Sequence, residues 1–399
     1  MKKLGFVIPW FGKKISGGAE LELKGLAEHL NAAGVEVEIL ATCVKEFSAD
    51  WNQNYYPEGV EVVNGIPVRR FRVRKRDTQA FDGVNYKLLN QIPLSSREEE
   101  IYAKEMVNSP DLYAYLKEKQ EEYGAYIFIP YMFGTTYYGV QVCPQKTVMI
   151  PCFHDESYAH MEIFKSVFSK VAGMLFLAQP ECDLAHRLFD LSRVKTEVMG
   201  AGVDTNMQCD ARRFREKYNI RSPFILYAGR KDAGKNVDTL VKYFAEYKKR
   251  NSSDLKLVLI GGGKIEIPQA MKGEILDLGF LPLQDKVDAY GASTFLCQPS
   301  KMESFSLVIM ESWLGRRPVL VYEGCEVTTH FAKCSHGGLY FANFFDFEGC
   351  VNYFMQNPVI ANQMGEEGRR FVLENFSWEV IVNKFCAFME NLVGSDQGR

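Results

Sequence analysis

Two cations in the second half of the chain have the types and spacing needed to bind a diphosphate. Arg230 and Lys235 lie in a glycine-containing loop, residues 229–236, that follows a short apolar run and leads into a helical pattern. Arginine presents a fork of hydrogen-bond donors to oxygen atoms, and lysine adds a mobile point charge. The two side chains, with the Gly229 backbone, suit a leaving group that gains negative charge as a bond breaks.

Two carboxylates follow further along the chain. Glu303 lies in a loop, and Glu311 lies eight positions later inside the next helical pattern. The backbone N–H groups of Phe305, Ser306 and Leu307 would stand at the N-terminus of that helix, where free donors and a partial positive charge favour an anion. Carboxylates beside an anion site are expected to hold sugar hydroxyls.

Weaker candidates lie in the first half. Gly17 and Gly18 follow the first apolar run and open a helical pattern, so their backbone can approach a phosphate closely. His154 follows another apolar run that ends at Pro151. A glycine pair can also be a simple turn, and a lone histidine is usually structural. In the second half of the chain, the glycine run at 261–263 is a weaker feature still, and by itself it does not separate a transferase from a dehydrogenase.

The elements that must position these residues are short apolar runs alternating with helical patterns. This alternation predicts parallel sheets covered by helices. Helices are expected at Ala19–Ala33, where leucines such as Leu21 and Leu23 recur and Gly34 ends the pattern, and at about 236–249 and 306–314. The predicted strands are 4–9, 35–41, 125–129, 147–151, 173–178 and 196–199, and then 224–228, 256–260, 294–298 and 318–321.

The pattern restarts near residue 205, which predicts two domains, 1–204 and 205–377. We expect an α/β fold of two Rossmann-like domains facing each other across a cleft, with ligands at the carboxyl ends of the strands. The chain has 399 residues, which is long for a single core.

Composition narrows the class of protein. Hydrophobic residues make up 47% and charged residues 24%, and the net charge is −3, so a nucleic-acid partner is not expected. The ten cysteines form no C-x-x-C pair or zinc spacing, which favours free thiols in a reducing cytosol. No apolar run is long enough for a membrane span.

The basic segment 69–76 is interpreted as a strand with one solvated basic face or, alternatively, as a contact for a membrane or a phosphate-bearing acceptor.

These motifs, in this order, resemble glycosyltransferase family 4, which has the GT-B fold, and the resemblance covers nearly the whole chain. The matching pieces are the Gly-Gly-Ala-Glu loop at 17–20, His154-Asp155, Gly-Arg…Lys-Asn at 229–236, Gly-Gly-Gly at 261–263, Gly-Phe-Leu at 279–281, Glu-x7-Glu at 303 and 311, and the strand at 316–321.

The resemblance implies roles for single residues. Gly17 and Gly18 would lie near the sugar donor's phosphates or the acceptor, and His154 would contact the donor sugar. Arg230 and Lys235 would bind the diphosphate. Glu303 would face the donor sugar, Glu311 would hold the ribose hydroxyls, and the backbone around Phe280 and Leu281 would form the pocket for the base.

The family retains anomeric configuration and usually works without a metal, and the chain contains no Asp-x-Asp. We therefore expect no metal and no cofactor. The last helix, 378–399, is expected to join the first domain, as it does in the family. One departure concerns the common Glu-Gly-Phe-Gly, which is Glu303-Ser304-Phe305-Ser306 here and puts the choice of sugar donor in doubt.

The expected function is transfer of a sugar from a UDP or GDP sugar to a glycan, lipid-linked or small-molecule acceptor in polysaccharide or glycoconjugate synthesis. The protein is expected in the cytoplasm, with contact to the inner membrane face through 69–76 as an option. Alternatives are a nucleotide-sugar epimerase on the same fold and a non-catalytic sugar-nucleotide-binding subunit. A NAD-dependent oxidoreductase is least favoured, because no G-x-G-x-x-G follows a strand with an acidic residue about 20 positions on.

Overall fold

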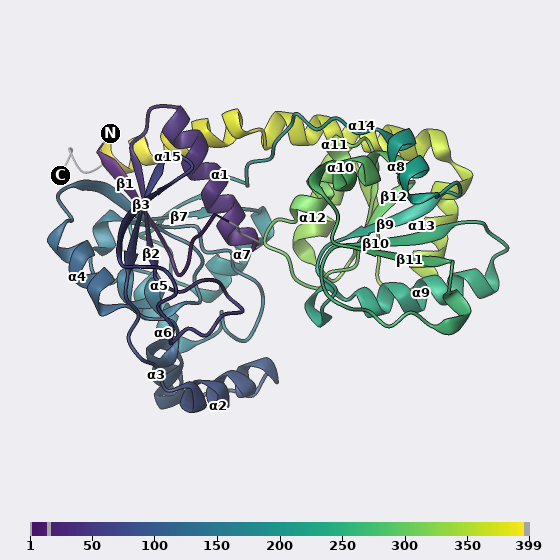
Figure 1. Ribbon diagram of the computed structural model, residues 1–399. Helices are drawn as coiled ribbons and strands as arrows, with labels where there is room; N and C mark the ends of the chain where they lie inside the picture. The colour runs from purple at the N-terminus through teal and green to yellow at the C-terminus, as the bar shows by residue number, and fades with distance from the viewer. Residues whose placement is uncertain (1, 14–16, 395–399) are drawn as a thin grey trace. The chain divides into compact units, whose positions relative to one another are not determined.

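The chain forms two compact units, each with its own hydrophobic core (Figure 1). The computed structural model describes residues 2–13 and 17–394. Unit 1 comprises Met1–Gly202 and Ile381–Arg399, and unit 2 comprises Val203–Val380. In the described part of the chain, no helix is both long enough and apolar enough to cross a membrane.

Unit 1 is built on a sheet that has eight strands within the described residues, in the order β3-β4-β2-β1-β5-β6-β7-β8. All neighbouring strands are parallel except β3, which pairs antiparallel with β4. The chain order reverses between β1 and β5, which are adjacent in the sheet. The strands are β1 Lys3–Ile8, β2 Val37–Thr42, β3 Gly59–Val63, β4 Ile66–Phe71, β5 Tyr123–Phe128, β6 Thr147–Met149, β7 Gly173–Phe176 and β8 Lys195–Val198.

Helices cover this sheet, as expected for a parallel sheet with buried strands. The C-terminal helix α15 (Trp378–Gly394) returns to unit 1, where the Phe385 ring stacks on Phe6 of β1. The other helical elements of unit 1 are α1 Gly18–Ala32, α2 Thr78–Leu89, α3 Ser96–Glu105, α4 Pro110–Glu118, α5 Gly134–Gly139, η1 Pro144–Lys146, α6 Glu162–Phe168 and α7 Gln179–Leu188.

Helix α1 confirms the predicted helix but not the side chains expected on its buried face. Leu23, Leu26 and Leu30 are buried, and Gly34, at φ +84°, ends the helix as expected. Leu21 is instead exposed, and the neighbouring Glu22 is buried in its place. The helix therefore carries a carboxyl group into the interior of unit 1.

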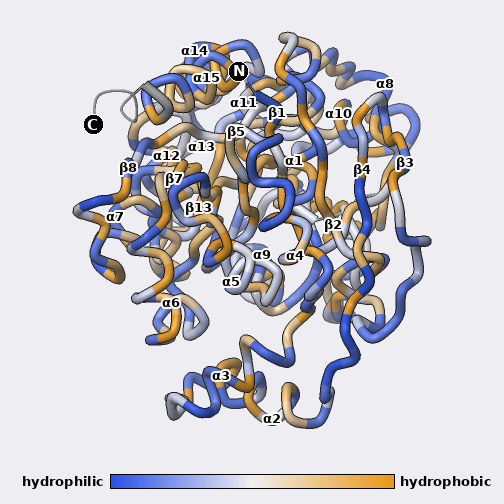
Figure 2. Tube along the Cα trace, turned by 90° about the vertical axis from the view of Figure 1, so that its left-hand side faces the viewer, coloured by the Kyte–Doolittle hydropathy of each residue, from blue (hydrophilic) through white to orange (hydrophobic). Residues whose placement is uncertain are grey.

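The basic segment 69–76 differs from the predicted strand with a solvated basic face. Strand β4 ends at Phe71, and a hydrophilic run continues towards α2 (Figure 2). Four of its six cations have contacts inside unit 1, and only Arg72 and Lys75 are exposed without a partner among the described residues. The four contacts are Arg69 with Glu38, Arg70 with Glu61, Arg74 with Glu105, and Arg76 with the ring of Trp51.

Unit 2 is a parallel sheet with six strands in the described residues, in the order β11-β10-β9-β12-β13-β14. The strands are β9 Phe224–Ala228, β10 Lys256–Ile260, β11 Ile275–Gly279, β12 Phe295–Gln298, β13 Val319–Tyr322 and β14 Gly338–Phe341. The helical elements are α8 Ala211–Tyr218, η2 Ala233–Lys235, α9 Val237–Arg250, η3 Gln269–Met271, α10 Leu283–Ala292, α11 Leu307–Leu314, α12 Glu326–Ser335, α13 Phe344–Gln356 and α14 Pro358–Asn375.

The predicted strands are all present in the two units, with ends that differ by at most two residues. Their apolar side chains are buried on both faces of each sheet, which is the reason why short continuous apolar runs identified them. Strands β3, β11 and β14 lie at the edges of the sheets and were not predicted, and β4 overlaps the predicted basic strand 69–76 only over its last three residues. The α/β class with two parallel-sheet units is thus confirmed.

Candidate functional site

The carboxyl ends of β9 and β12 define the place in unit 2 where a ligand is most readily held. From β9 the chain proceeds outward through β10 to β11, and from β12 it proceeds the other way through β13 to β14. Because β9 and β12 are neighbours, the strand order reverses between them, and parallel sheets usually bind ligands in a crevice at such a point. The predicted cations follow β9, and the predicted carboxylates follow β12.

The loop after β9 contains one buried cation that sequence reasoning left without a role. The Lys231 side chain is buried, its Nζ lies 3.0 Å from Asp277, and it also donates to the Gly261 carbonyl. Gly229 has a φ of +154°, and the backbone N–H groups of Gly229 and Lys231 donate to Ile260 and Gly262 at the end of β10. Lys231 thus fixes the shape of the loop, and the glycine run at 261–263 supports it.

The two predicted cations differ in their surroundings. Arg230 is mostly exposed, and its guanidinium lies 3.4 Å from Asp232. Lys235 is largely buried, and its Nζ lies 2.6 Å from Oε1 of Glu303. The same Glu303 oxygen accepts a hydrogen bond from Gln298, at 3.1 Å. The structure therefore brings Lys235 and Glu303 together where the loops after β9 and β12 meet, while Arg230 is exposed to solvent.

The N-terminus of α11 carries a backbone strain at the position where the family pattern has glycine. Ser306 is the N-cap residue and has a φ of +79°, a left-handed conformation that costs a residue with a Cβ about 1–2 kcal/mol. Phe305 before it is buried, and Leu307 begins the helix. Gln298 lies 3.5 Å from the Ser306 hydroxyl, and its own buried Oε1 has no partner among the described residues.

Glu311 has a set of partners separate from that of Glu303. Its Oε1 lies 2.6 Å from Nζ of Lys286, and its Oε2 accepts a hydrogen bond from the Tyr290 hydroxyl at 2.5 Å. Burial, with the Glu311 carboxylate next to it, raises the pKa of Tyr290 well above its usual range, so this hydroxyl stays a donor. Lys286 and Tyr290 lie on α10, a helix that was not predicted from the sequence, so neither residue was identified.

The residues predicted at the base lie at the far edge of the sheet. Gly279 ends β11 with a φ of +65°, and Phe280 follows with 87% of its side chain exposed. Leu281 is partly buried, and Leu283 at the start of α10 is exposed. Two exposed large apolar side chains so close together are free to contact a flat ring.

Unit 1 contains the remaining predicted residues. Gly17 and Gly18 stand at the N-terminus of α1, and a Cβ at Gly17 would meet only the flexible end of the Glu20 side chain. His154 follows β6 and is partly exposed, with its Nδ1 3.5 Å from Glu156. Glu156 also accepts a hydrogen bond from the Tyr131 hydroxyl at 3.1 Å.

Two buried carboxyl groups of unit 1 escaped sequence reasoning. Burial raises the pKa of Glu181 to about 7, although three backbone N–H groups, among them those of Phe153 and Leu177, donate to it. Burial raises the pKa of Glu22 to about 8, with a single opposing hydrogen bond from the Gly202 backbone. Glu181 lies on α7 and Glu22 lies on α1. A glutamate in a helical sequence pattern is ordinarily expected to be exposed to solvent, so neither was singled out.

Residues 210–371, within unit 2, match the family model described as Glycosyl transferases group 1. No curated protein sequence matches the chain significantly. Among the described residues, no group of three or more His, Cys, Asp or Glu side chains is arranged to hold a metal ion.

Solved structures resemble the whole chain in fold at low sequence identity. Sucrose-phosphate synthase from Thermosynechococcus elongatus is 16% identical, with 99% of this chain and 100% of that chain covered and a TM-score of 0.70. HepE from Anabaena, in complex with UDP, is 14% identical, with 98% and 100% covered and a TM-score of 0.70. α,α-Trehalose 6-phosphate synthase from Burkholderia multivorans is 11% identical, with 99% and 100% covered and a TM-score of 0.69. This likeness confirms the GT-B fold class.

Proposed function

We propose that the protein is a glycosyltransferase that uses a nucleoside diphosphate sugar and binds the nucleotide in unit 2. The observation that carries the proposal is the ion pair of Lys235 and Glu303 at the crevice between β9 and β12, within a segment that matches a glycosyltransferase family model. A lysine next to a glutamate suits a substrate in which a phosphate lies next to sugar hydroxyls, because the lysine can bind the phosphate and the carboxylate can accept from the hydroxyls.

In this proposal unit 2 stabilises the departing diphosphate. Lys235 and Arg230 supply two positive charges, and the amides of Phe305, Ser306 and Leu307 supply the positive end of α11. As the bond from the sugar to the phosphate breaks, negative charge grows on the diphosphate, and groups already in position stabilise it without reorganising.

The carboxylates are assigned to hydroxyl groups. Glu303 would accept from the donor sugar, and Lys235 would then turn from Glu303 towards the phosphate. Each oxygen of Glu311 retains a further lone pair beside Lys286 or Tyr290, so it can accept from ribose hydroxyls. Phe280 and Leu281 are assigned to the base, and Gly17, Gly18 and His154 of unit 1 to the donor and acceptor, as the resemblance to family 4 implies.

The finer parts of the proposal are retention of configuration, catalysis without a metal, and a UDP sugar as donor. The choice of uridine is supported by HepE, a protein of the same fold that was solved with UDP and with UDP-glucose. The acceptor class is a glycan, a lipid-linked saccharide or a small molecule. Membrane contact through 69–76 would rest on Arg72 and Lys75, since the other cations are engaged within unit 1.

Product analysis tests the proposal. The protein is incubated with UDP-glucose or GDP-glucose and a panel of sugar and sugar-phosphate acceptors, and released nucleotide and remaining donor are measured. A transferase releases UDP or GDP in step with a new glycoside. An epimerase changes the sugar and releases no nucleotide, and a non-catalytic subunit binds the donor and leaves it intact. Either of the last two results refutes the proposal.

A further inference from the structure

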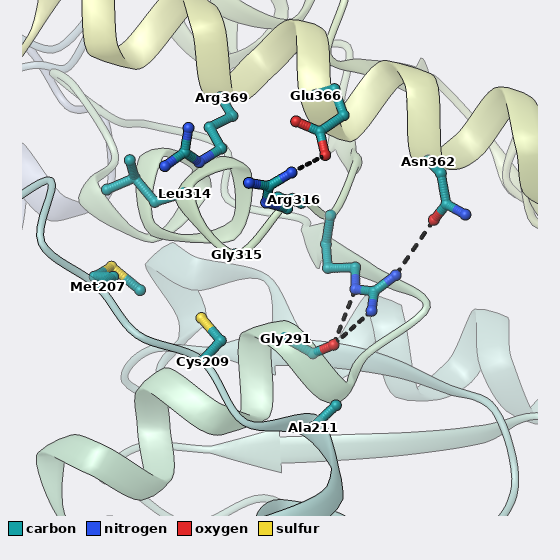
Figure 3. Close-up of a pocket in the computed structure, with 11 residues that line it drawn as sticks. Met207, Cys209, Ala211, Gly291, Leu314, Gly315, Arg316, Asn362, Glu366 and Arg369 are labelled. Atoms are coloured by element: carbon teal, nitrogen blue, oxygen red, sulfur yellow. Dashed lines mark hydrogen bonds and ion pairs between the residues drawn. The ribbon is translucent and has the colours of Figure 1, made fainter.

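A cavity in unit 2 lies at the C-terminal end of α11, the opposite end from Glu303 and Ser306. It has a volume of about 500 Å³ and is bounded by the C-terminal ends of α10 and α11, by one face of α14 and by the segment that leads into α8 (Figure 3). Small-molecule sites commonly measure about 300–1,000 Å³. The cavity is therefore large enough for a compact organic molecule, and none of the residues assigned to the donor lines it.

The lining has an excess of positive charge. Three arginines, Arg316, Arg317 and Arg369, line the cavity together with one carboxylate, Glu366. Glu366 and Arg369 are three positions apart on α14 and so lie on the same face of that helix (Figure 3). A site with three guanidinium groups and one carboxylate favours an anionic ligand.

The three arginines are incompletely compensated. Arg316 lies 2.5 Å from Glu366, in a pair that is more than half exposed. Arg317 donates twice to the Gly291 carbonyl and once to Asn362, and within the described residues it has no carboxylate partner. Burial, with the nearby Arg215 cation, lowers the pKa of Arg317. Arg369 has no polar partner in the described part of the chain, so its donors are available.

The backbone adds an independent observation. Arg316 follows the C-terminus of α11 with a φ of +59°, at the position where glycine is usual because a Cβ is unfavourable there. Arginine at this position costs stability that glycine would not. A strained residue whose side chain borders a cavity is a candidate for function, because the strain has to be offset by another gain.

We propose that this cavity binds a small phosphomonoester, with the phosphate among Arg316, Arg317 and Arg369. Guanidinium groups present paired N–H donors that match phosphate oxygens. Met207 and Leu314 form an apolar wall that receives the organic part of the ligand. The site is distinct from the one assigned to the sugar donor, so it stands whether or not the proposed function is correct.

Cys209, which also lines the cavity, provides a local measurement. The full chain is treated with iodoacetamide at increasing concentrations of phenyl phosphate or inorganic phosphate, and alkylation of each cysteine is followed by mass spectrometry. Both ligands should slow alkylation of Cys209, phenyl phosphate at the lower concentration because of the apolar wall. Cys334, which is exposed on α12, is the internal control and should react at an unchanged rate.

Variants that change one charge test whether phosphate protects Cys209 by binding to the arginines of the cavity. Arg369→Gln should raise the phosphate concentration needed for half-protection about tenfold, the worth of one charge-assisted hydrogen bond. Glu366→Gln should lower that concentration, because it removes the competing carboxylate. The matched control Arg370→Gln changes the next residue, which pairs with Glu367 and does not line the cavity, and should have no effect.

Two further variants separate phosphate binding at this cavity from loss of folding and from binding at the donor site. Arg316→Gly should weaken protection while leaving the melting temperature equal or higher, which separates lost binding from lost folding. Lys235→Ala should leave protection of Cys209 unchanged, which places the phosphate outside the donor site. The proposal is overturned if phosphate does not protect Cys209, if Arg369→Gln and Arg370→Gln behave alike, or if Glu366→Gln weakens protection.

Discussion

Replacing Glu22 by glutamine should change how the stability of unit 1 depends on pH. Glu22 is buried in the middle of α1, its Oε1 has no partner among the described residues, and burial raises its pKa to about 8. The folded protein therefore holds a proton on this carboxyl between pH 4.5 and about 8, while the unfolded chain has released it. Because the folded state binds more protons in this window, the free energy of unfolding falls as the pH rises through it.

The size of the effect follows from the width of the window. As the pH rises from 4.5, the ordinary pKa of the group, to about 8, the free energy of unfolding falls by about 1.4 kcal/mol per pH unit. Over the whole window the Glu22 carboxyl therefore lowers the free energy of unfolding by on the order of 5 kcal/mol. Its contribution is constant below pH 4.5 and again above pH 8. Glutamine does not titrate, but its amide would bring a donor to a buried place without an acceptor, at a cost of about 1–3 kcal/mol at every pH.

The two stability curves are therefore expected to cross. Glu22→Gln should be less stable than the parent near pH 4.5 and more stable by about 2–4 kcal/mol above pH 8. Hydrogen exchange of peptides from β1 and β5, whose amides belong to the core of unit 1, reports the free energy of unfolding of this unit alone. Glu181 has a raised pKa in both proteins, so its contribution cancels in the comparison.

The control is Glu28→Gln on the same helix. The Glu28 side chain is 32% exposed and lies 3.9 Å from Lys24, and a surface ion pair of this kind is worth about 0–1 kcal/mol, so its replacement should not reproduce the crossing of the two stability curves. A constant difference between Glu22→Gln and the parent from pH 4.5 to pH 9 would refute the reasoning, because it would mean that Glu22 loses its proton at the same pH in the folded and unfolded chains.

Further predictions concern the proposed donor site. Lys235→Ala should weaken nucleoside diphosphate binding by about 1.5–3 kcal/mol in calorimetry and leave the free nucleoside nearly unaffected, whereas the exposed Lys242→Ala on α9 should change neither. Glu311→Gln should weaken binding of donor and spent nucleotide alike. Glu303→Gln should instead lower kcat, by about 10²-fold, with spent-nucleotide affinity kept, and equal losses of affinity in both variants would contradict these roles. Ser306→Gly should raise the free energy of unfolding of unit 2 by about 1 kcal/mol in urea denaturation, since it removes the left-handed strain. Activity should survive a chelator, and loss in EDTA with recovery in Mg²⁺ would contradict metal-free catalysis.

Much of the architecture follows from local patterns. Strand β9 is apolar throughout, and β10 is apolar after Lys256, because both faces of a parallel sheet are buried, so their runs are visible in the sequence. The hairpin of β3 and β4 also has a local signal, the Asn64-Gly65 turn, in which both residues have positive φ. It went unrecognised because β3 lies at an edge and is mostly exposed, so it lacks the apolar run that identified the other strands.

The pairing of side chains at the candidate site has no such local signal. Lys235 and Glu303 are 68 positions apart, and they meet because β9 and β12 are neighbours in the sheet although they are not consecutive in the chain. The sequence marks both residues as members of loops after strands, but the strand order that makes those loops adjacent is a property of the folded sheet. The partners of Glu311 on α10 are decided in the same way.

Burial is the second property that only the tertiary structure decided. The helical pattern of the sequence does not indicate whether Leu21 or its neighbour Glu22 is buried. In the folded chain Leu21 is exposed and the Glu22 carboxyl group is buried. The segment 69–76 shows the reverse case, in which a cation that looks solvated in the sequence, Arg70, is buried between Glu61 of the paired strand and the ring of Tyr56. Sequence by itself determined the class of fold, the positions of its buried strands along the chain and the loops that contain the candidate site residues. Which side chains are paired, strained or desolvated depends on contacts between distant segments, and these exist only once the sheets have formed.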